Sequence, residues 1–267
     1  MEKLGILAGA GKLPVECARA AKQLGYEVYA VGLLADSDPA IAHFATDYQF
    51  ISVAQLEAIL NYLKGNQIQN VTLIGKVTKE LLFNGAVQPD MRMLQLIMSL
   101  PDRNDDTIMM AFVRELARAG IQTFDQTKLI RKLMPPRGNI AGREPTEQER
   151  RDMEFGFRIA KELGRLDIGQ TVVVKNLAVM ALEAIEGTDA CIERGGKLAC
   201  GGAVVAKVSK PQQDNRFDVP TVGYRTIEQM AQVGATALAI EAGKTLLVER
   251  EQMIALADAN GISIFAM

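Results

Sequence analysis

Residues 3–33 read KLGILAGAGKLPVECARAAKQLGYEVYAVGL and decide the fold of the chain. Apolar residues dominate 3–9 and 26–33, whereas the apolar positions of 13–25 have helical spacing and stop at a glycine. A strand, a helix and a second strand at this spacing predict a βαβ unit, and such a unit requires a parallel sheet.

Gly9, Gly11 and Lys12 lie in the turn that joins the first strand to its helix. Backbone N–H groups and a helix N-terminus meet in such a turn and can bind an anion, so we expect these residues to contact substrate. Pro14 stands where a dinucleotide-binding fingerprint has its third glycine, and proline suits the first turn of a helix. A plain strand-to-helix turn is the alternative.

The alternation continues with a helix at 55–66 and a third strand at 70–77, which stops near Gly75 and Lys76. Ligands of open α/β sheets bind outside the carboxyl ends of strands, so Lys76 is a candidate phosphate contact, with a solvated lysine as the alternative. Helices are expected near 90–100, 106–120 and 127–134, and Asp105-Asp106-Thr107 is a natural cap for the second of them.

The composition changes at 133–148, where three prolines, glycines and many charges predict a linker between domains 1–132 and 149–267. Thr146 begins a helix that runs to about 165. Strands at 171–175 and 177–185, joined by a tight turn at Lys175-Asn176, predict an antiparallel hairpin. A helix from about Thr188 and a strand at 201–210 complete a smaller domain of mixed α/β structure.

The 267 residues have 48% hydrophobic content and a net charge of −2, which suits a globular protein and gives no field for nucleic acid. Three cysteines without a CxxC pair fit a reducing cytoplasm. No run of eighteen apolar residues is present. The N-terminus predicts a first strand and not a signal peptide. We therefore expect a cytoplasmic protein that binds no nucleic acid.

His43 is the single histidine, and a structural role at the surface is its simplest explanation. Ser-His-Asp and Cys-His catalysis are excluded unless His43 is the base, as are metal centres that need several imidazoles. Any hydrolysis must then use carboxylates, lysines and a metal that prefers oxygen ligands.

Glu186-Gly187-Thr188-Asp189 offers two carboxylates around a glycine, just where a strand is expected to give way to a helix. One interpretation is a helix cap, in which Thr188 accepts backbone N–H groups and Asp189 interacts with the helix dipole. The other is a Mg²⁺ site formed by Glu186 and Asp189, with helix amides holding phosphate. The two interpretations are compatible.

The polar loop at 207–223 is the last candidate. It contains Lys207, Lys210, Asp214, Arg216 and Asp218, as well as two prolines. A rigid, highly charged loop that follows an apolar strand is suited to ligand contact, and a solvated surface loop is the alternative.

Gly243-Lys244-Thr245 resembles the end of a P-loop. The required earlier glycine is replaced by Leu238, so a P-loop is rejected.

Four stretches together carry a family resemblance: GAGKLP (9–14), Asp105-Asp106-Thr107, EAIEGTDACI (183–192) and KVSKPQQDNRFDVPTVG (207–223). In this order they resemble the two-domain, magnesium-dependent UDP-2,3-diacylglucosamine pyrophosphatases of lipid A biosynthesis. The resemblance implies a Rossmann-like N-terminal domain, a distinct α/β C-terminal domain, and lipid between them. It also implies hydrolysis of the substrate to 2,3-diacylglucosamine 1-phosphate and UMP.

By the EGTD match, the family's essential aspartate is Asp189, which would hold Mg²⁺ or orient the attacking water. Lys207 or Arg216 would stabilise the leaving phosphate, and Asp105, Asp106 and Thr107 would contact the substrate. Two acyl chains on the substrate imply transient contact with the inner-membrane surface. A homodimer is left open.

Two functions from other classes remain as alternatives. The first βα turn favours an NAD(P)-dependent oxidoreductase, although Pro14 and the lack of an acidic residue that closes the second strand count against it. A non-catalytic protein that binds nucleotide sugars or lipid is the other alternative.

Overall fold

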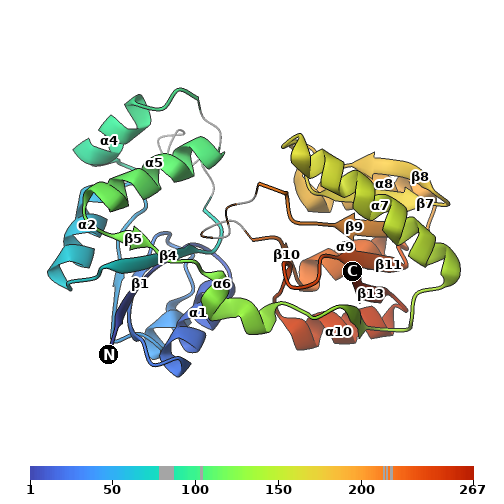
Figure 1. Ribbon diagram of the computed structural model, residues 1–267, viewed down its shortest axis with the longest axis horizontal. Helices are drawn as coiled ribbons and strands as arrows, with labels where there is room; N and C mark the ends of the chain where they lie inside the picture. Colours follow the sequence, from blue (N-terminus) through green and yellow to red (C-terminus); the bar gives the residue numbers. More distant parts are fainter. Residues whose placement is uncertain (78–86, 103–104, 213, 215, 217–218) are drawn as a thin grey trace. The chain divides into compact units, whose positions relative to one another are not determined.

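The computed structural model describes residues 1–77, 87–102, 105–212, 214, 216 and 219–267, except for the side chains of 105–106. Contacts divide the chain into two compact units (Figure 1). Unit 1 contains residues 1–130 and Arg216, and unit 2 contains 131–214 and the chain from Val219 onward. Among the described residues, no helix has the length and apolar character that crossing a membrane requires.

The sheet of unit 1 has the strand order β3-β2-β1-β4-β5, and all of its pairings are parallel. Its strands are β1 (Lys3–Ala8), β2 (Glu27–Gly32), β3 (Asp47–Phe50), β4 (Asn70–Ile74) and β5 (Gln122–Thr123). This order is that of a Rossmann-type sheet and reverses direction between β1 and β4. The parallel sheet and the Rossmann-like fold expected for the N-terminal half are therefore confirmed.

Helices cover the sheet of unit 1. They are α1 (Leu13–Gln23), the 3₁₀ helix η1 (Pro39–His43), α2 (Leu56–Gly65), α4 (Met91–Met98), α5 (Asp105–Arg118) and α6 (Thr127–Ile130). The apolar sides of α2, α4 and α5 contribute Leu60, Met93 and Leu116 to one core with Leu7 and Val71 of the sheet.

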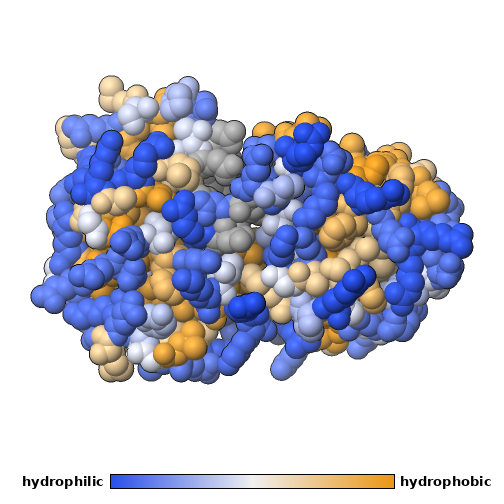
Figure 2. Space-filling model, viewed as in Figure 1, coloured by the Kyte–Doolittle hydropathy of each residue, from blue (hydrophilic) through white to orange (hydrophobic). Residues whose placement is uncertain are grey.

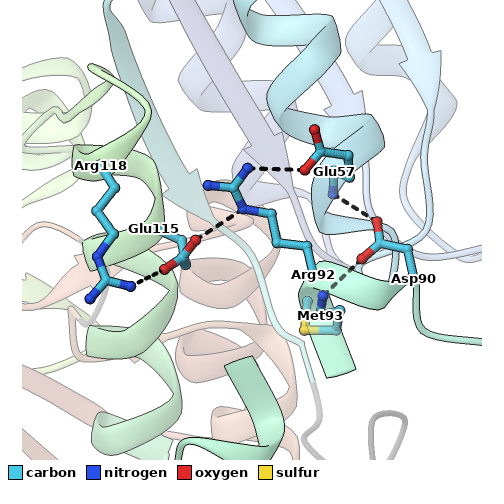
Figure 3. A network of polar contacts seen from close by, with 6 residues as sticks. All are labelled: Glu57, Asp90, Arg92, Met93, Glu115 and Arg118. Carbon is cyan, nitrogen blue, oxygen red and sulfur yellow. Dashed lines mark hydrogen bonds and ion pairs between the residues drawn. The ribbon is translucent and has the colours of Figure 1, made fainter. Parts of the chain in front are cut away.

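A polar network holds α2, α4 and α5 together on their outer side (Figure 3). Arg92 Nη1 and Nε each lie 3.0 Å from a carboxylate, of Glu57 and Glu115 respectively. Asp90 caps α4 through the N–H of Met93 and also accepts the N–H of Glu57. Arg92 is partly buried, so its two ion pairs are more favourable than fully exposed ones.

The main sheet of unit 2 is mixed, with the order β6-β13-β11-β9-β7-β8. Its strands are β6 (Gly138–Ala141), β7 (Thr171–Lys175), β8 (Ala178–Leu182), β9 (Val204–Lys207), β11 (Ala237–Ile240) and β13 (Ser263–Ala266). Strands β9, β11 and β13 are parallel, whereas β6 and β7 run antiparallel to their neighbours. The mixed α/β second domain is confirmed, and the two units are similar in length.

Alternating apolar residues bury both faces of this sheet, as the period of a strand requires. Val172, Val174 and Ala206 lie on the face covered by α7 (Glu147–Arg165). Val173 and Val205 lie on the opposite face, with α8 (Gly187–Ala199), α9 (Tyr224–Gln232) and α10 (Arg250–Ala259). A pair of short parallel strands, β10 (Thr221–Val222) and β12 (Leu246–Leu247), completes the unit.

The stretch expected to be a linker, residues 133–148, lies within unit 2. The 3₁₀ helix η2 (Arg131–Leu133) precedes β6, and β6 pairs with β13 at the edge of the sheet. Thr146 and Glu149 form the capping box of α7. Residues 138–141 are therefore paired in the sheet of unit 2, and the linker bounds remain a prediction.

The hairpin β7–β8 forms as expected, but its turn is one residue later. Asn176 and Leu177 have φ of 50° and 60°, the conformation of a type I′ turn. The buried carboxylate of Asp152 accepts the N–H groups of both residues, at 2.9 and 2.6 Å. This partner on α7, distant in sequence, explains why leucine tolerates a positive φ here.

Several large apolar side chains remain exposed around β8 and α8, namely Leu177, Val179, Leu182, Ile185 and Leu198. Figure 2 shows hydrophobic colouring in the region where Figure 1 labels β8. β8 is the edge strand of the sheet, and it leads directly into the EGTD sequence.

Candidate active site

The EGTD sequence forms the corner between β8 and α8. Gly187 is the first residue of α8 and has φ of +81°, a value that glycine adopts without strain. Among the described residues, no atom lies within 4 Å of where its Cβ would be, so the backbone conformation is what requires glycine here. The corner places Thr188 and Asp189 in the first turn of α8, at the carboxyl end of β8.

Thr188 does not cap the helix, which corrects one of the expectations. The N-cap position of α8 is Glu186, whose side chain makes no capping hydrogen bond. The hydroxyl of Thr188 instead donates to Glu183 Oε1 at 3.0 Å and lies 3.3 Å from Thr171 Oγ1. Glu183 is only 7% exposed and also accepts the N–H of Gln170, so its buried carboxylate requires these donors.

The two carboxylates of the corner have different surroundings. Glu186 accepts the N–H of Ala184 at 3.1 Å and an N–H of Arg194 at 2.6 Å. Its own backbone N–H and then Arg194 hold the pKa of the Glu186 carboxyl below its usual range. Asp189 is 47% exposed, and its carboxylate lies 3.8 Å from the guanidinium of Arg225 in the first turn of α9. Asp189 is therefore the more accessible of the two.

Lys207 ends β9 beside the EGTD corner. The register pairs Lys207 with Thr171, and Thr171 O accepts the N–H of Glu183 at 2.9 Å. The Lys207 side chain is 7% exposed, and its ammonium donates to Thr221 O at 2.9 Å. The structure thus brings Lys207, Glu183 and the start of α8 to one edge of the sheet in unit 2.

Lys210 follows on the same edge and pairs with Asp167 at 2.6 Å. Asp214 is partly buried. Arg216 is grouped with unit 1, where its Nη2 lies 3.9 Å from Met110 Sδ. Asp218 lies outside the described residues.

In unit 1, the turn after β1 packs against the end of β4. Gly9 N donates to Ile74 O and Ala10 N to Lys76 O, both at 2.9 Å, and Lys76 N donates back to Ala10 O at 3.1 Å. A Cβ on Gly9 would lie 2.7 Å from Lys76 O. The close packing therefore requires glycine at position 9, and the N–H groups of Gly9 and Ala10 are bonded to the chain segment at 74–76 and do not face an anion.

Lys12 and Lys76 lie at this edge of unit 1, one from each chain segment. Lys12 Nζ pairs with Asp38 Oδ2 at 2.8 Å, and Lys76 is exposed. The Lys12 hydrogen bond, followed by the N–H of Ala40, holds the pKa of the Asp38 carboxyl below its usual range. Gly9, Gly11, Lys12 and Lys76 are thus gathered at the point where the strand order reverses, the place where α/β sheets bind ligands.

The acidic pair at 105–106 begins α5, as its expected capping position suggests. The side chains of Asp105 and Asp106 lie outside the described part of the structure, and Thr107 is partly exposed. These three residues remain predictions as substrate contacts.

Four residues near the unit 2 edge were not anticipated from the sequence: Lys161, Thr171, Glu183 and Glu241. Glu241 follows β11 and is 8% exposed, and it accepts hydrogen bonds from Lys161 Nζ and from Ser209 N. An acidic residue directly after the apolar run ALAI (237–240) was a signal that could have revealed it. Lys161 lies in the C-terminal part of α7, and its sequence context contains no comparable signal.

Mg²⁺ was expected at Glu186 and Asp189. Within the described residues, no group of three His, Cys, Asp or Glu side chains converges as a metal cluster. Mg²⁺ that acts on phosphates takes one or two carboxylates and completes its shell with water and substrate oxygens. Asp189 fits that requirement because its carboxylate is half exposed with one long ion pair, whereas both oxygens of Glu186 are already bonded.

Family models and a curated relative match the chain along its length. The models are described as the LpxI N-terminal domain, at residues 3–133, and the LpxI C-terminal domain, at 136–265. The relative is the UDP-2,3-diacylglucosamine pyrophosphatase LpxI of Caulobacter vibrioides. It is 32% identical over 279 residues, which cover 100% of this chain and 98% of the relative.

Solved structures give only weak matches. An ADP complex of N5-carboxyaminoimidazole ribonucleotide synthetase is 18% identical, covers 65% of this chain and 32% of its own, and has a TM-score of 0.30. The enzyme of the same name from Thermotoga maritima is 17% identical, with 70% and 42% covered and a TM-score of 0.25. The chain spans less than half of either protein, and these scores carry no argument.

Both halves of the sequence match the same family. Each half matches its own domain model, and the full-length relative aligns across the two in one continuous comparison. This protein belongs to the LpxI family.

Proposed function

We propose that this protein hydrolyses the diphosphate of UDP-2,3-diacylglucosamine to 2,3-diacylglucosamine 1-phosphate and UMP, a step of lipid A biosynthesis. The relative from Caulobacter vibrioides bears the name of this activity and aligns over the full chain. One structural observation carries the proposal: the edge of the unit 2 sheet combines an accessible carboxylate, Asp189, with a buried ammonium, Lys207.

The residues of this edge have separable roles. Asp189 orients the attacking water or holds Mg²⁺, which, when bound, withdraws charge from the diphosphate. The buried Lys207 ammonium stabilises the negative charge of the leaving phosphate, because a buried charge is less screened than an exposed one. Lys210 lies beside it and contributes a second positive charge.

A turnover assay tests the proposal directly. Purified protein in detergent micelles with UDP-2,3-diacylglucosamine and Mg²⁺ should release UMP and the lipid 1-phosphate in equal amounts. EDTA should abolish turnover, and added Mg²⁺ or Mn²⁺ should restore it. Substrate binding without release of product would favour the non-catalytic alternative. Full activity after thorough chelation would show that the reaction needs no metal ion.

The oxidoreductase alternative loses support at the first βα turn. Gly9 N and Ala10 N are bonded to the carbonyls of Ile74 and Lys76, so these two N–H groups of the turn are not available to a dinucleotide pyrophosphate. Titration with NADPH, followed by its fluorescence, should show no binding at micromolar concentrations.

A membrane contact follows from the acyl chains of the proposed substrate. Lys128, Arg131, Lys132 and Arg137 are exposed, and no acidic residue occurs from 126 to 143 in a chain of net charge −2. Figure 2 shows strongly hydrophilic residues where Figure 1 labels α6. Basic residues near an anionic surface each contribute about 1 kcal/mol, so this segment suits anionic phospholipid.

Vesicle flotation tests that contact. The protein should float with phosphatidylglycerol vesicles and not with phosphatidylcholine vesicles, and changing all four residues to Gln should abolish flotation. A control variant with four scattered exposed basic residues changed to Gln, Lys22, Lys64, Arg114 and Arg158, should still float. If both variants lost flotation equally, binding to the vesicles would depend on net charge and not on this segment.

A further inference from the structure

The backbone of Ser209 is held on both sides by buried charged groups. Ser209 lies two residues beyond the end of β9, and Glu241 lies one residue beyond the end of the neighbouring parallel strand β11. Ser209 N donates to Glu241 Oε2 at 3.0 Å, and Ser209 O accepts from Lys161 Nζ at 2.9 Å. Lys161 also bonds to Glu241, so the three residues form a closed set of contacts.

Burying these charged groups costs free energy unless each of them has a hydrogen-bond or ion-pair partner. Ser209 and Glu241 are buried, and Lys161 is mostly covered. Burial raises the pKa of the Glu241 carboxyl, but Lys161, then Lys244 and the Ser209 N–H, lower it to a net value below its usual range. Charge-assisted hydrogen bonds are stronger than neutral ones, so the segment around Ser209 is fixed more firmly than an ordinary strand end.

The fixed residue lies between two candidate phosphate contacts. Lys207 precedes it by two residues, and Lys210 follows it directly. A displacement of about 1 Å at a reacting centre can lower a rate on the order of a hundredfold. The position of Ser209 therefore controls where both ammonium groups can reach.

We propose that Lys161 and Glu241 are positioning residues, which hold Ser209 so that Lys207 and Lys210 meet the diphosphate in the correct geometry. The inference rests on the proposed function, since it concerns the same reaction. Neither residue touches the substrate in this account.

Lys244 provides a matched control. Its Nζ lies 2.8 Å from Glu241 Oε1 and so neutralises the same carboxylate, but it has no contact with Ser209 among those described. Both lysines pair with Glu241, and Lys161 also donates to the backbone carbonyl of Ser209.

The experiment compares Lys161→Gln, Lys161→Arg and Lys244→Gln in the turnover assay, with kcat expressed per folded protein from thermal unfolding curves. We expect Lys161→Gln to lower kcat about tenfold to a hundredfold with KM within threefold, and Lys161→Arg to restore most of the loss. Lys244→Gln should remain within twofold of the unmodified protein. If Lys161→Gln does not fold, Glu241→Gln takes its place, with the same expected loss of kcat.

Two failures are distinguishable. Absence of turnover in the unmodified protein overturns the proposed function. Normal turnover in that protein, together with equal kcat in the Lys161→Gln and Lys244→Gln variants, overturns the positioning role alone. A loss confined to thermal stability, with kcat per folded protein unchanged, also overturns it.

Discussion

The carboxyl edges of the two sheets are built from different groups. The edge of unit 1 is mostly backbone: Gly9 and Ala10 bond to the end of β4, and its lysines are exposed. The edge of unit 2 contains buried charges, among them Lys207, Glu183 and Glu241. A buried charge acts through a lower dielectric than an exposed one. We therefore propose that residues of unit 2 carry out the reaction and that residues of unit 1 make only weak contacts with the substrate.

The largest expected effect compares one lysine from each edge. Lys207→Met should lower kcat roughly 10²–10³-fold, because it removes a buried donor from the developing phosphate charge. Lys76→Met should lower kcat/KM by about fivefold at most, equivalent to about 1 kcal/mol for an exposed charge. Steady-state kinetics and thermal unfolding check both variants. If Lys76→Met lost more activity than Lys207→Met, the reaction would have to be assigned to the edge of unit 1.

The next effect separates stability from activity within unit 2. Glu149 lies near Thr236, which precedes β11 and is thus at the opposite end of the sheet. Burial raises the pKa of the Glu149 carboxyl, but hydrogen bonds from Arg143, Thr236 and Thr146 lower it to about 2, from an ordinary value of 4.5. The depressed pKa stabilises the fold above pH 4.5, and this stabilisation is lost as pH falls toward 2.

Glu149→Gln should therefore lower the free energy of unfolding at pH 7 by about 3 kcal/mol. The difference from the unmodified protein should shrink as the pH falls from 4.5 to 2. Urea unfolding across this range measures it, and kcat at pH 7 should not change. A fall in kcat that matches the Lys207 variant would show that the two ends of the sheet are not separable.

A smaller effect tests the backbone construction of the unit 1 edge. Gly75 and Gly11 both have φ of +97°, but a Cβ on Gly75 would lie 2.8 Å from Pro14 Cγ, whereas no atom of the described residues lies within 4 Å of one on Gly11. Gly11→Ala should cost about 1 kcal/mol from the unfavourable φ alone. Gly75→Ala should cost about 2–4 kcal/mol, because the steric clash adds to that strain. Equal costs in urea unfolding would contradict the close packing of the two segments.

Arg225 is expected to give the smallest effect. Its guanidinium is 82% exposed and 3.8 Å from Asp189, so Arg225→Gln should change stability by less than about 0.5 kcal/mol. Turnover should stay within threefold. If this variant reproduced the loss expected for a change of Asp189, the aspartate would act by holding Arg225 and not on the substrate.

Much of the fold could be predicted because local patterns determine it. The run from 3 to 33 gave β1, α1 and β2 to within one or two residues, and Thr146 with Glu149 marked the start of α7. β3 was missed because its residues 47–50 alternate weakly and remain half exposed at the sheet edge. β6 was missed because prolines and glycines around it suggested a linker, while its pairing with β13 is more than a hundred residues away in sequence.

The candidate site was predicted where its residues are consecutive. EGTD was located from the sequence, but Thr188 was assigned to a cap because its true partner, Glu183, required knowledge of the corner. Lys161 and Glu241 come from a helix and a strand eighty residues apart. A single sequence contains no local signal that such residues meet, since the parallel pairing of β9 and β11 brings Glu241 to Ser209 and the packing of α7 on the sheet brings Lys161 there.

Asp189→Asn tests the central claim most directly, because it keeps the shape of the side chain and removes its charge. If Asp189 were only an acid in the first turn of α8, its loss would cost about 0.3–1 kcal/mol of stability and little activity. We predict instead that kcat with saturating Mg²⁺ falls at least about a hundredfold, while the unfolding curve and substrate binding are retained. A folded variant that binds substrate and turns it over at a near-normal rate would contradict the assignment of the reaction to this edge of unit 2.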